Sequence, residues 1–415
     1  MSDFSGFKDL TPEERLQKIK VHAGLTDEEV ELLRKYGKLD LNKASMMIEN
    51  VYSTNELPLG LATNFVVDGK EYVIPMCIEE PSVVAAASYA AKLARETGGF
   101  KTRADEPEMI GQIQLVNVSN IEVAAQKIFH NKEKIIELCN AKDPVLLKYG
   151  GGCRDVFTKT LHTERGDMLI VYIIVDVRDA MGANAINTMA EHITPFLEEL
   201  TGAKHRLRII SNLADRRKAY AEAIWKKEII GEDAVEGILD AYEFAKHDIY
   251  RCATHNKGIM NGIDALTIAT GNDFRAVEAG AHAYASVDGY HPLTKYEKTP
   301  EGDLKGSLEL PLVFGIVGGA TRTNPIAQIS LKILGVKSSQ ELARVACALG
   351  LAQNFAALRA LSQEGIQLGH MRLHAKNIAI TAGAANEQIE AVAKQIIKEK
   401  NITVGRAKEI LEGMA

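Results

Sequence analysis

The sequence predicts an α+β protein in which a large helical part is interrupted by a small domain of mixed strands and helices. Three observations predict this fold class. Apolar residues recur at helical spacing over much of residues 1–106 and 215–368. Between them, residues 107–214 follow a β-α-β-β-α-β pattern, which is typical of a separate small domain. Residues 369–415 form modest helices with a polar surface, which indicates a C-terminal appendage.

The bulk composition is that of an ordinary globular protein. Its 415 residues are 46% hydrophobic and 25% charged, which suits two or three domains. The formal net charge of -6 does not favour a nucleic-acid partner. No apolar run approaches the roughly 18 residues of a membrane helix, and the charged first residues are unlike a signal peptide. Five scattered cysteines predict a reducing cytoplasm, without disulfides or structural zinc.

The first part begins with short helices and a hairpin. Thr11-Pro12 places a capping residue and a proline at a helix start, and residues 25–29 repeat the signal. Residues 64–78 predict a hairpin with its turn at Asp68-Gly69. A helix is expected over residues 81–97.

The remaining elements follow from the spacing of apolar residues, which repeats about every 3.6 residues in a helix and every second residue in a strand. In the small domain we expect strands over 111–118, 168–175 and 206–210, and a helix over 121–138. In the second half we expect a strand over 308–316. The helices expected there are 219–229, 234–245, 259–285, 325–334 and 339–364.

Four polar segments are hard to explain by packing alone. Residues 253–262 (ATHNKGIMNG) predict a polar loop leading into a helix, with Lys257 beside a glycine that lets the backbone approach a ligand. The alternative is a solvated lysine at a helix start. Asp273 follows a Gly271-Asn272 break, and the alternative there is a simple helix cap. For Asp273 to touch Lys257, that break must reverse the chain, because a straight helix would separate them by about 24 Å.

The other two segments offer a carboxylate and a histidine. Glu80 precedes a proline that opens a helix, where an ionised carboxylate is favoured, so a proton donor there needs burial or a second carboxylate. The alternative is an N-terminal charge preference. His370 and His374 are spaced i, i+4, but without the metalloprotease glutamate or a third ligand, so we expect no metal. A single acid-base histidine is the better interpretation of His370, and His374 suits a structural role.

Two glycine-containing loops favour a phosphate-bearing ligand. Residues 176–184 (DVRDAMGAN) directly follow a buried strand, and Gly182 precedes a helix whose amides could receive a pyrophosphate. Residues 318–323 (GGATRT) form a second loop of this type. Each signal alone is weak, and the G-x-G-x-x-G fingerprint is missing.

These segments, in this order, closely resemble class II HMG-CoA reductases over nearly the whole chain from Phe7. The most specific runs are ATHNKGIMNGIDALTIATGNDFRAVEAGAHAYA from Ala253 and GLAQNFAALRALSQEGIQLGHMRLHAKNIA from Gly350. The shorter matching runs are ENVYSTNELPLGLATNF, EEPSVVAAAS, GGGCRD, DVRDAMGANAINTMAE and SNLAD. The chain departs from the family at Tyr52-Ser53, where Ile-Gly is frequent.

The resemblance implies the four-electron interconversion of HMG-CoA with mevalonate and coenzyme A, through a mevaldehyde-level intermediate, with two NAD(H) per turnover. Lys257 matches the lysine that stabilises the oxyanion of the reacting carbonyl. Glu80 matches the glutamate that exchanges a proton with the aldehyde-level oxygen. Asp273 matches an aspartate of the same cluster. His370 matches the histidine that protonates the departing thiolate.

The resemblance also implies binding residues. Those matching the HMG-binding positions are Arg251, Ser82, Asn261 and Asn212. Lys8 stands where some members have an arginine near the coenzyme A nucleotide. Those matching the dinucleotide loop are Asp179, Met181, Gly182 and Asn184. Asp143 matches an acidic residue facing the adenosine ribose, where a carboxylate would repel a 2′-phosphate, so we expect NAD(H) to be preferred over NADP(H).

In domain terms the resemblance implies a large HMG-CoA domain (1–106 and 215–368), an inserted ferredoxin-like NAD(H)-binding domain (107–214) and a C-terminal flap (369–415). It implies a cytoplasmic homodimer, or a higher oligomer, with active sites at the subunit interface. Two other functions remain open from the residues. One is a different nicotinamide dehydrogenase acting on a small hydroxy acid, and the other is a catalytically silent nucleotide-binding scaffold. A requirement for a coenzyme A ester separates the first from the reductase.

Overall fold

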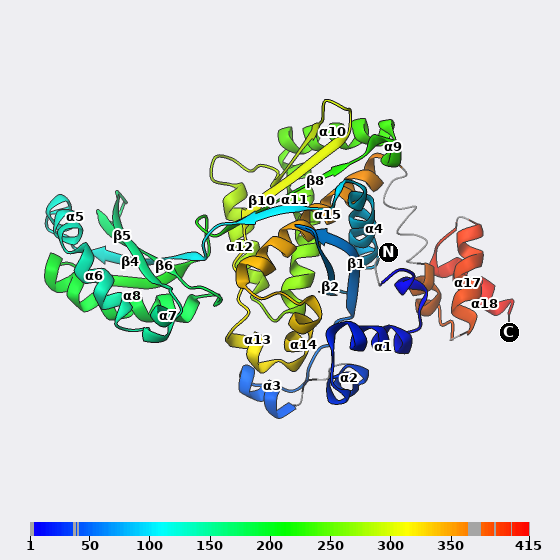
Figure 1. Cartoon of the computed structure of the whole chain (residues 1–415), viewed down its shortest axis with the longest axis horizontal. Helices are drawn as coiled ribbons and strands as arrows, with labels where there is room; N and C mark the ends of the chain where they lie inside the picture. The colour runs from blue at the N-terminus through cyan, green and yellow to red at the C-terminus, as the bar shows by residue number, and fades with distance from the viewer. Residues whose placement is uncertain are drawn as a thin grey trace.

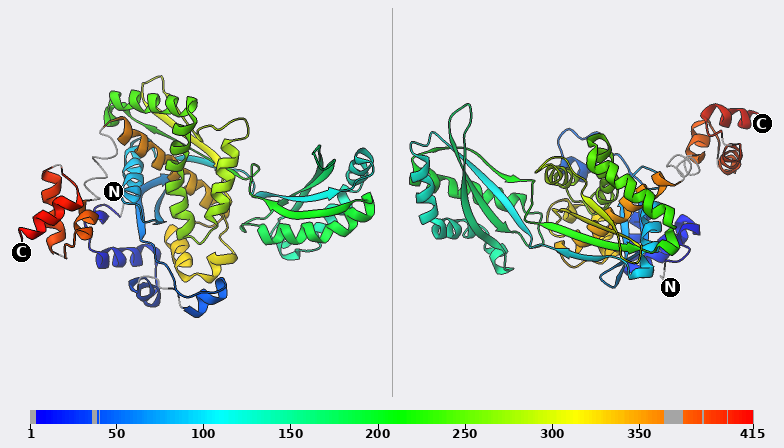
Figure 2. Two further views of the ribbon diagram at one scale, coloured as in Figure 1. Left: turned by 180° about the vertical axis from the view of Figure 1, so that it is seen from behind. Right: turned by 90° about the horizontal axis from the view of Figure 1, so that it is seen from above.

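The structure is a computed structural model, and it describes residues 4–35, 39, 41–363, 375–385, 387–399 and 401–414. A mixed body of helices and strands occupies the centre of Figure 1, and a second, smaller sheet with its own helices extends to one side. The same separation is seen from behind and from above in Figure 2. These two bodies are joined where the strands of the smaller sheet begin and end.

The N-terminal helices begin where the sequence places capping residues. These elements are η1 (Phe7–Asp9), α1 (Pro12–Ala23), α2 (Asp27–Arg34) and α3 (Leu41–Met47). At α1, the Thr11 hydroxyl accepts from the Glu14 amide while the Glu14 carboxylate accepts from the Thr11 amide. Thr26 and Glu29 form the same capping box at α2. Both predicted helix starts are confirmed.

A hairpin and a helix lead into the site. Strands β1 (Leu59–Val67) and β2 (Lys70–Cys77) pair antiparallel, and both residues of the Asp68-Gly69 turn have positive φ. Positive φ at both turn residues is typical of a type I′ turn, and the predicted hairpin with its turn at Asp68-Gly69 is confirmed. Helix α4 (Val83–Ala94) and the short η2 (Arg95–Thr97) follow.

The central sheet has the strand order β3-β8-β10-β9 and is antiparallel throughout. Its strands are β3 (Lys101–Ala104), β8 (Lys218–Trp225), β9 (Thr294–Lys298) and β10 (Leu304–Pro311). The helix expected over residues 219–229 is wrong for this part of the chain, because β8 occupies it before the short α9 (Lys227–Ile230). Burial alternates along β8, so that Ala219, Ala221, Ala223 and Trp225 face the core. Alanine-rich alternation resembles a helix locally, and pairing with β3 and β10 decides for a strand.

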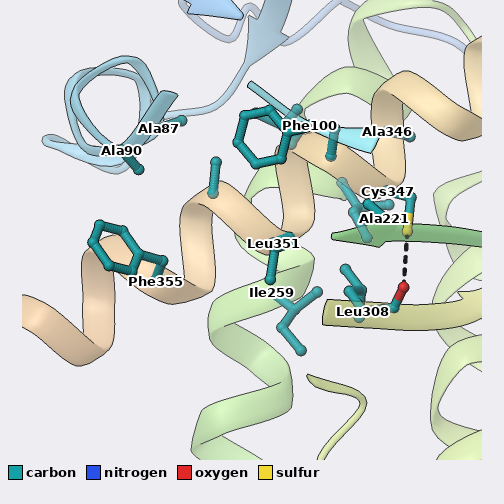
Figure 3. Packing of buried hydrophobic residues seen from close by; sticks show 14 of the residues in the cluster. Ala87, Ala90, Phe100, Ala221, Ile259, Leu308, Ala346, Cys347, Leu351 and Phe355 are labelled. Atoms are coloured by element: carbon teal, nitrogen blue, oxygen red, sulfur yellow. Dashed lines mark hydrogen bonds between the residues drawn. The ribbon is translucent and has the colours of Figure 1, made fainter. Parts of the chain in front are cut away.

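Long helices complete the central body. They are α10 (Glu232–His247), α11 (Ile249–Ala269), α12 (Phe274–Ala285), α13 (Gly319–Thr323), α14 (Pro325–Leu334) and α15 (Ser339–Ser362). The expected helix over 259–285 is therefore two helices. In Figure 3, Leu351 of α15 lies beside Ile259 of α11, whereas Phe355 of the same helix lies on the side of Ala90 in α4. The sulfur of Cys347 donates to the Leu308 carbonyl at 3.5 Å.

The length and apolar composition of α15 are those of a membrane-crossing helix, and it is the one candidate in the described part of the chain. However, 67% of its apolar window is buried inside the protein. Packing in the core is therefore sufficient to explain its composition.

The smaller body follows the β-α-β-β-α-β order that the sequence predicts. Its elements are β4 (Glu108–Val116), α5 (Ile121–His130), α6 (Lys132–Asn140), α7 (Pro144–Lys148), β5 (Gly152–Leu161), β6 (Met168–Asp176), α8 (Ala183–Thr201) and β7 (Lys204–Ser211). The sheet order is β5-β6-β4-β7, all antiparallel. The helix expected over 121–138 is interrupted at Asn131. The buried residues of the smaller body, among them Met109, Ile173, Ile186 and Leu197, form a hydrophobic cluster of their own.

Beyond residue 374, helices α17 (Glu387–Lys398) and α18 (Val404–Glu412) pack on a third small cluster that includes Val392, Ile396 and Ala407. The polar surface expected for this region therefore covers a small apolar core.

Candidate active site

The structure brings Lys257 together with Glu80. Lys257 lies in the middle of α11, and Glu80 lies in the bend between β2 and α4. Nζ of the lysine donates to Oε2 of the glutamate at 3.2 Å. The two side chains are 60% and 36% exposed, so both remain open to a ligand.

The polar segment around Lys257 is helical, so the expected loop over residues 253–262 is wrong. Cys252, His255, Asn256 and Ile259 are buried on the inner face of α11, while Lys257 is exposed. The polar residues of this segment divide between the two faces of the helix: Thr254 and Lys257 are exposed, whereas His255 and Asn256 are buried. Asn261 is one turn beyond Lys257 and shares its face. A helix holds such side chains more rigidly than a loop would.

Asp273 caps α12 at the far end of α11. Its Oδ1 accepts from the amides of Arg275 at 3.0 Å and Ala276 at 3.2 Å, and the Arg275 guanidinium lies 3.0 Å away. Gly271 has φ 67°, and the chain reverses so that α12 packs on α11. Both the cap and the reversal are therefore confirmed.

The length of α11 separates Asp273 from Lys257 within one chain. The helix is unbroken from Lys257 to Ala269, and these twelve positions rise by about 18 Å. Asn272 then hydrogen-bonds back to Thr267 through its amide at 2.9 Å. Within one chain, Glu80 and Lys257 therefore meet, whereas Asp273 lies beyond the C-terminal end of α11.

Ser82, close to Glu80 in the chain, has an unusual backbone conformation. It has φ 77°, an unusual left-handed conformation for a residue other than glycine, and it precedes α4. Its Oγ is buried and makes no hydrogen bond with the described residues. Buried polar atoms usually have a partner, so this hydroxyl has an unused capacity to bind a ligand.

Arg251 lies in the first turn of α11, where its amide donates to Oδ1 of Asp248 at 2.7 Å. Burial lowers the pKa of its guanidinium from the ordinary value. A half-buried cation without a described salt bridge suits an anionic ligand.

Two predicted substrate residues lie on other elements. Asn212 is exposed in the loop after β7, and its backbone oxygen packs closely against Gly280 of α12. Lys8 is exposed in η1, and its carbonyl accepts from Arg15 at 2.8 Å. The contacts named for Asn212 and Lys8 are therefore with Gly280 and Arg15, outside the Glu80–Lys257 pair. His370 and His374 lie outside the described residues.

The loop over residues 176–184, which we call the dinucleotide loop after its predicted role, leads from β6 into α8. Gly182 has φ 103°, and a Cβ there would lie 2.7 Å from the Val177 side chain, so only glycine fits. The 19-residue α8 begins directly after it, and its first amides offer an anion site. Met181 is half-buried and Asn184 is exposed at this helix start. The residues present therefore fit a pyrophosphate.

Asp143 lies in the same region. Its carboxylate caps α7 by accepting from the Leu146 amide at 2.8 Å. Gly151 packs between Leu146 and the end of β6, because a Cβ on it would lie 2.6 Å from the carbonyl oxygen of Asp176. The Asp143 turn thus abuts the strand end from which the dinucleotide loop emerges.

Sequence reasoning missed several polar residues that are buried or half-buried. Arg217, at 4% exposure, donates to backbone carbonyls of the dinucleotide loop. Asp264 and Glu278 share a hydrogen bond between α11 and α12, and burial raises the pKa of Asp264. The i, i+7 spacing of Asp264 from Lys257 could have placed it on the same face of α11. No local signal distinguishes Arg217, because most arginines are exposed.

In the described ranges, no cluster of three or more His, Cys, Asp or Glu side chains is arranged to hold a metal ion. Hydrogen bonds and ion pairs connect the charged groups of the candidate site.

Comparison with known proteins identifies the family. The family model of hydroxymethylglutaryl-coenzyme A reductase matches residues 11–375. The 3-hydroxy-3-methylglutaryl-coenzyme A reductase of Archaeoglobus fulgidus is 58% identical over 412 residues, covering 99% of this chain and 94% of that protein. A probable reductase of Borreliella burgdorferi is 35% identical, covering 80% of this chain and 77% of that protein.

Solved structures agree. The reductase of Streptococcus pneumoniae has a TM-score of 0.84 at 41% identity, covering 99% of this chain and 100% of that one. The class II enzyme of the same organism, bound to NADPH in open conformations, has a TM-score of 0.83 at 41% identity, covering 98% and 100%. The chain therefore belongs to the hydroxymethylglutaryl-coenzyme A reductase family, as a prokaryote-type class II member whose reaction links HMG-CoA and mevalonate through a nicotinamide cofactor.

Proposed function

We propose that this protein interconverts HMG-CoA with mevalonate and coenzyme A, using two NAD(H), at a site built on Glu80 and Lys257. The 3.2 Å ion pair between these residues is the observation that carries the proposal. An ammonium held beside a carboxylate stabilises the oxyanion that forms when a carbonyl accepts hydride. The carboxyl group of Glu80, at the same place, exchanges a proton with the aldehyde-level oxygen.

The other roles follow the family match. Arg251, Ser82 and Asn261 flank the ion pair on α11 and at the start of α4, and we assign them to the HMG group. The unpartnered Ser82 hydroxyl supports this assignment. We assign Asn212 to the same group and Lys8 to the coenzyme A nucleotide. His370 is proposed as the acid that protonates the departing thiolate.

We propose that the reduced cofactor, which supplies hydride when bound, occupies the dinucleotide loop. Gly182 and the start of α8 would hold its pyrophosphate, and Asp179, Met181 and Asn184 would border it. Asp143 would accept from the ribose 2′-hydroxyl and repel a 2′-phosphate, which favours NAD(H). The relative from Streptococcus pneumoniae binds NADPH, so this preference is a property of this chain that needs its own measurement.

We propose further that Asp273 completes the site of a partner subunit in a homodimer. The support is the helical rise of about 18 Å that separates it from Lys257 within one chain. Exposed apolar side chains near the start of α11 offer a surface for such an assembly, among them Ile249 at 62% and Tyr250 at 83% exposure. A higher oligomer built from such dimers is compatible with this arrangement.

The domain division is part of the proposal. We assign residues 1–106 and 215–368 to HMG-CoA, 107–214 to a ferredoxin-like NAD(H) domain, and 369–415 to a flap, in a cytoplasmic enzyme. Separate hydrophobic clusters in the three parts support this division. Closure of the flap would exclude water from the site at the appropriate step.

The test is the change in absorbance at about 340 nm when purified protein is mixed with HMG-CoA and NADH or NADPH. We expect oxidation of two cofactors per mevalonate, and loss of activity by roughly 100-fold or more in Lys257→Ala. Lys246→Ala is the matched control, because Lys246 is also an exposed lysine paired with a glutamate, at 2.8 Å. A protein that leaves both cofactors unchanged, or that acts equally on small hydroxy acids without coenzyme A, would refute the proposal.

A further inference from the structure

The dinucleotide loop is fastened to the central body through its backbone. The carbonyl oxygens of residues 178–181 all accept hydrogen bonds from donors outside the inserted segment. Ser339 Oγ donates to the first at 2.9 Å, and the Ile316 amide donates to the second at 2.9 Å. Nη1 of Arg217 donates to the last two at 3.1 and 3.3 Å. The loop is therefore held at each peptide by the neighbouring body.

Arg217 is the central part of this attachment. Its guanidinium is buried at the start of β8, and Nη2 also donates to the carbonyl of Phe314. Asp176 and Asp179 act on its charge, while burial lowers its pKa to about 10. A buried cation that bonds to carbonyls rather than directly to a carboxylate is costly, so its retention needs a geometric reason. The rigid fork of arginine can join two chain segments where lysine offers a single point.

Asn272 connects the same region to Asp273. Its Oδ1 accepts from the Gly315 amide at 2.8 Å, and its Nδ2 donates to Thr270 Oγ1 at 3.0 Å. Gly315 touches the dinucleotide loop, because a Cβ on it would lie 2.7 Å from the Met181 nitrogen. A continuous path of bonds and contacts thus runs from the turn that carries Asp273 to the loop proposed to hold the dinucleotide.

We propose that Arg217 and Asn272 are positioning residues for hydride transfer. Together they clamp residues 314–316 between the dinucleotide loop and the Asp273 turn, so that cofactor and carboxylate keep a fixed separation. This inference rests on the proposed function, since it takes the dinucleotide loop and Asp273 as parts of the site. Neither residue touches the reacting atoms in this role, and each acts through the backbone that it holds.

The first test is equilibrium binding of NADH, followed by NADH fluorescence without substrate. Arg217→Met should weaken NADH binding roughly tenfold or more, while the KM for HMG-CoA changes less than about threefold. Arg217→Lys should recover part of the affinity. Arg216→Met is the matched control, because Arg216 is an exposed neighbour that pairs with Glu108 at 3.5 Å, and it should bind as the wild type does. Wild-type affinity in Arg217→Met overturns the role of Arg217.

The second test separates alignment from affinity and does not depend on Arg217 variants folding. Asn272→Ala removes the acceptor for Gly315 and should lower kcat roughly tenfold, with NADH affinity within about twofold. Asn272→Asp keeps an oxygen acceptor and should restore most of kcat. If the two variants have the same kcat, whether high or low, the acceptor has no positioning role and the proposal for Asn272 fails.

A third variant distinguishes this inference from the proposed function. Gly182→Val crowds Val177 inside the loop and should abolish NADH binding. NADH binding that survives in Gly182→Val refutes the proposed cofactor site itself. Loss of binding in Gly182→Val together with wild-type binding in Arg217→Met refutes only the clamp. Thermal unfolding of each variant identifies losses that come from misfolding.

Discussion

Lys257 Nζ lies 3.2 Å from Glu80 Oε2, although 177 positions separate the two residues in the chain. One partner is on a rigid helix and the other is in a bend after a strand, so the packing of β2 against α11 sets their approach. Asp273 lies beyond the C-terminal end of the same helix, as the N-cap of α12. Because of this arrangement, mixing variant chains can show which subunit supplies each of the three side chains to a site.

If Asp273 serves the partner's site, two inactive variants should complement each other. Lys257→Ala and Asp273→Asn chains are each expected to be inactive, and asparagine preserves the cap of α12. After co-refolding, half of the dimers would be hybrids with one intact site in two, which gives about a quarter of wild-type activity. Activity of the mixed sample is measured against each variant alone.

The control for this experiment uses the ion pair within one chain. Lys257→Ala mixed with Glu80→Gln should not recover activity, because every hybrid site then carries one defect. Recovery in this control, or no recovery with Asp273→Asn, would contradict the assignment of Asp273 to the partner subunit.

Ser82→Ala should separate binding from stability. The Ser82 hydroxyl is buried without a partner among the described residues, so its loss should leave the melting temperature unchanged or higher. If it binds the HMG group, the KM for HMG-CoA should rise roughly tenfold, the value of one hydrogen bond to a charged group. Ser330→Ala is the matched control, since that hydroxyl is also buried and unpartnered but lies in α14. Equal KM values in the two variants would contradict the assignment.

Asp143→Asn should reduce the preference for NADH over NADPH by roughly tenfold or more, because it removes the charge that repels a 2′-phosphate. Asparagine can still cap α7, so the turn that begins with the 2.8 Å bond to Leu146 should persist. The measurement is kcat/KM with each cofactor. An unchanged ratio would show that another group discriminates between the cofactors.

Asp264→Asn should flatten the dependence of stability on pH. Burial, together with Glu278, raises the pKa of Asp264 above its ordinary value of 3.8. The folded chain therefore keeps a proton that the unfolded chain has lost. This contribution to stability is complete in acid and disappears as the pH rises through the raised pKa. His282 faces the pair through Glu278, at 2.8 Å, and is unchanged in the variant.

Thermal unfolding between about pH 5 and 9 tests this, because the wild type should lose more stability than Asp264→Asn over the range. Asp240→Asn, in an exposed position of α10, is the control and should follow the wild type. Parallel curves for the wild type and Asp264→Asn would contradict the prediction.

Local chemistry in the sequence by itself determined several features of this protein. The capping boxes at Thr11 and Thr26 start helices, the Asp68-Gly69 pair turns a hairpin, and Gly182 opens α8, because each depends on residues within one turn. The apolar run over residues 168–175 predicts β6 for the same reason. The family resemblance, carried by long specific runs, identifies the candidate site residues without reference to their contacts.

Only the tertiary structure decided how those residues meet. It made a strand of residues 218–225 and a helix of 253–262, and it buried Arg217, against or beyond local expectation. Alanine-rich and polar segments fit more than one local pattern, so their secondary structure depends on the distant segments with which they pack. The Glu80–Lys257 contact and the loop's attachment through Arg217 arise from segments far apart in the chain. Their physical origin is long-range packing, which local periodicity does not encode.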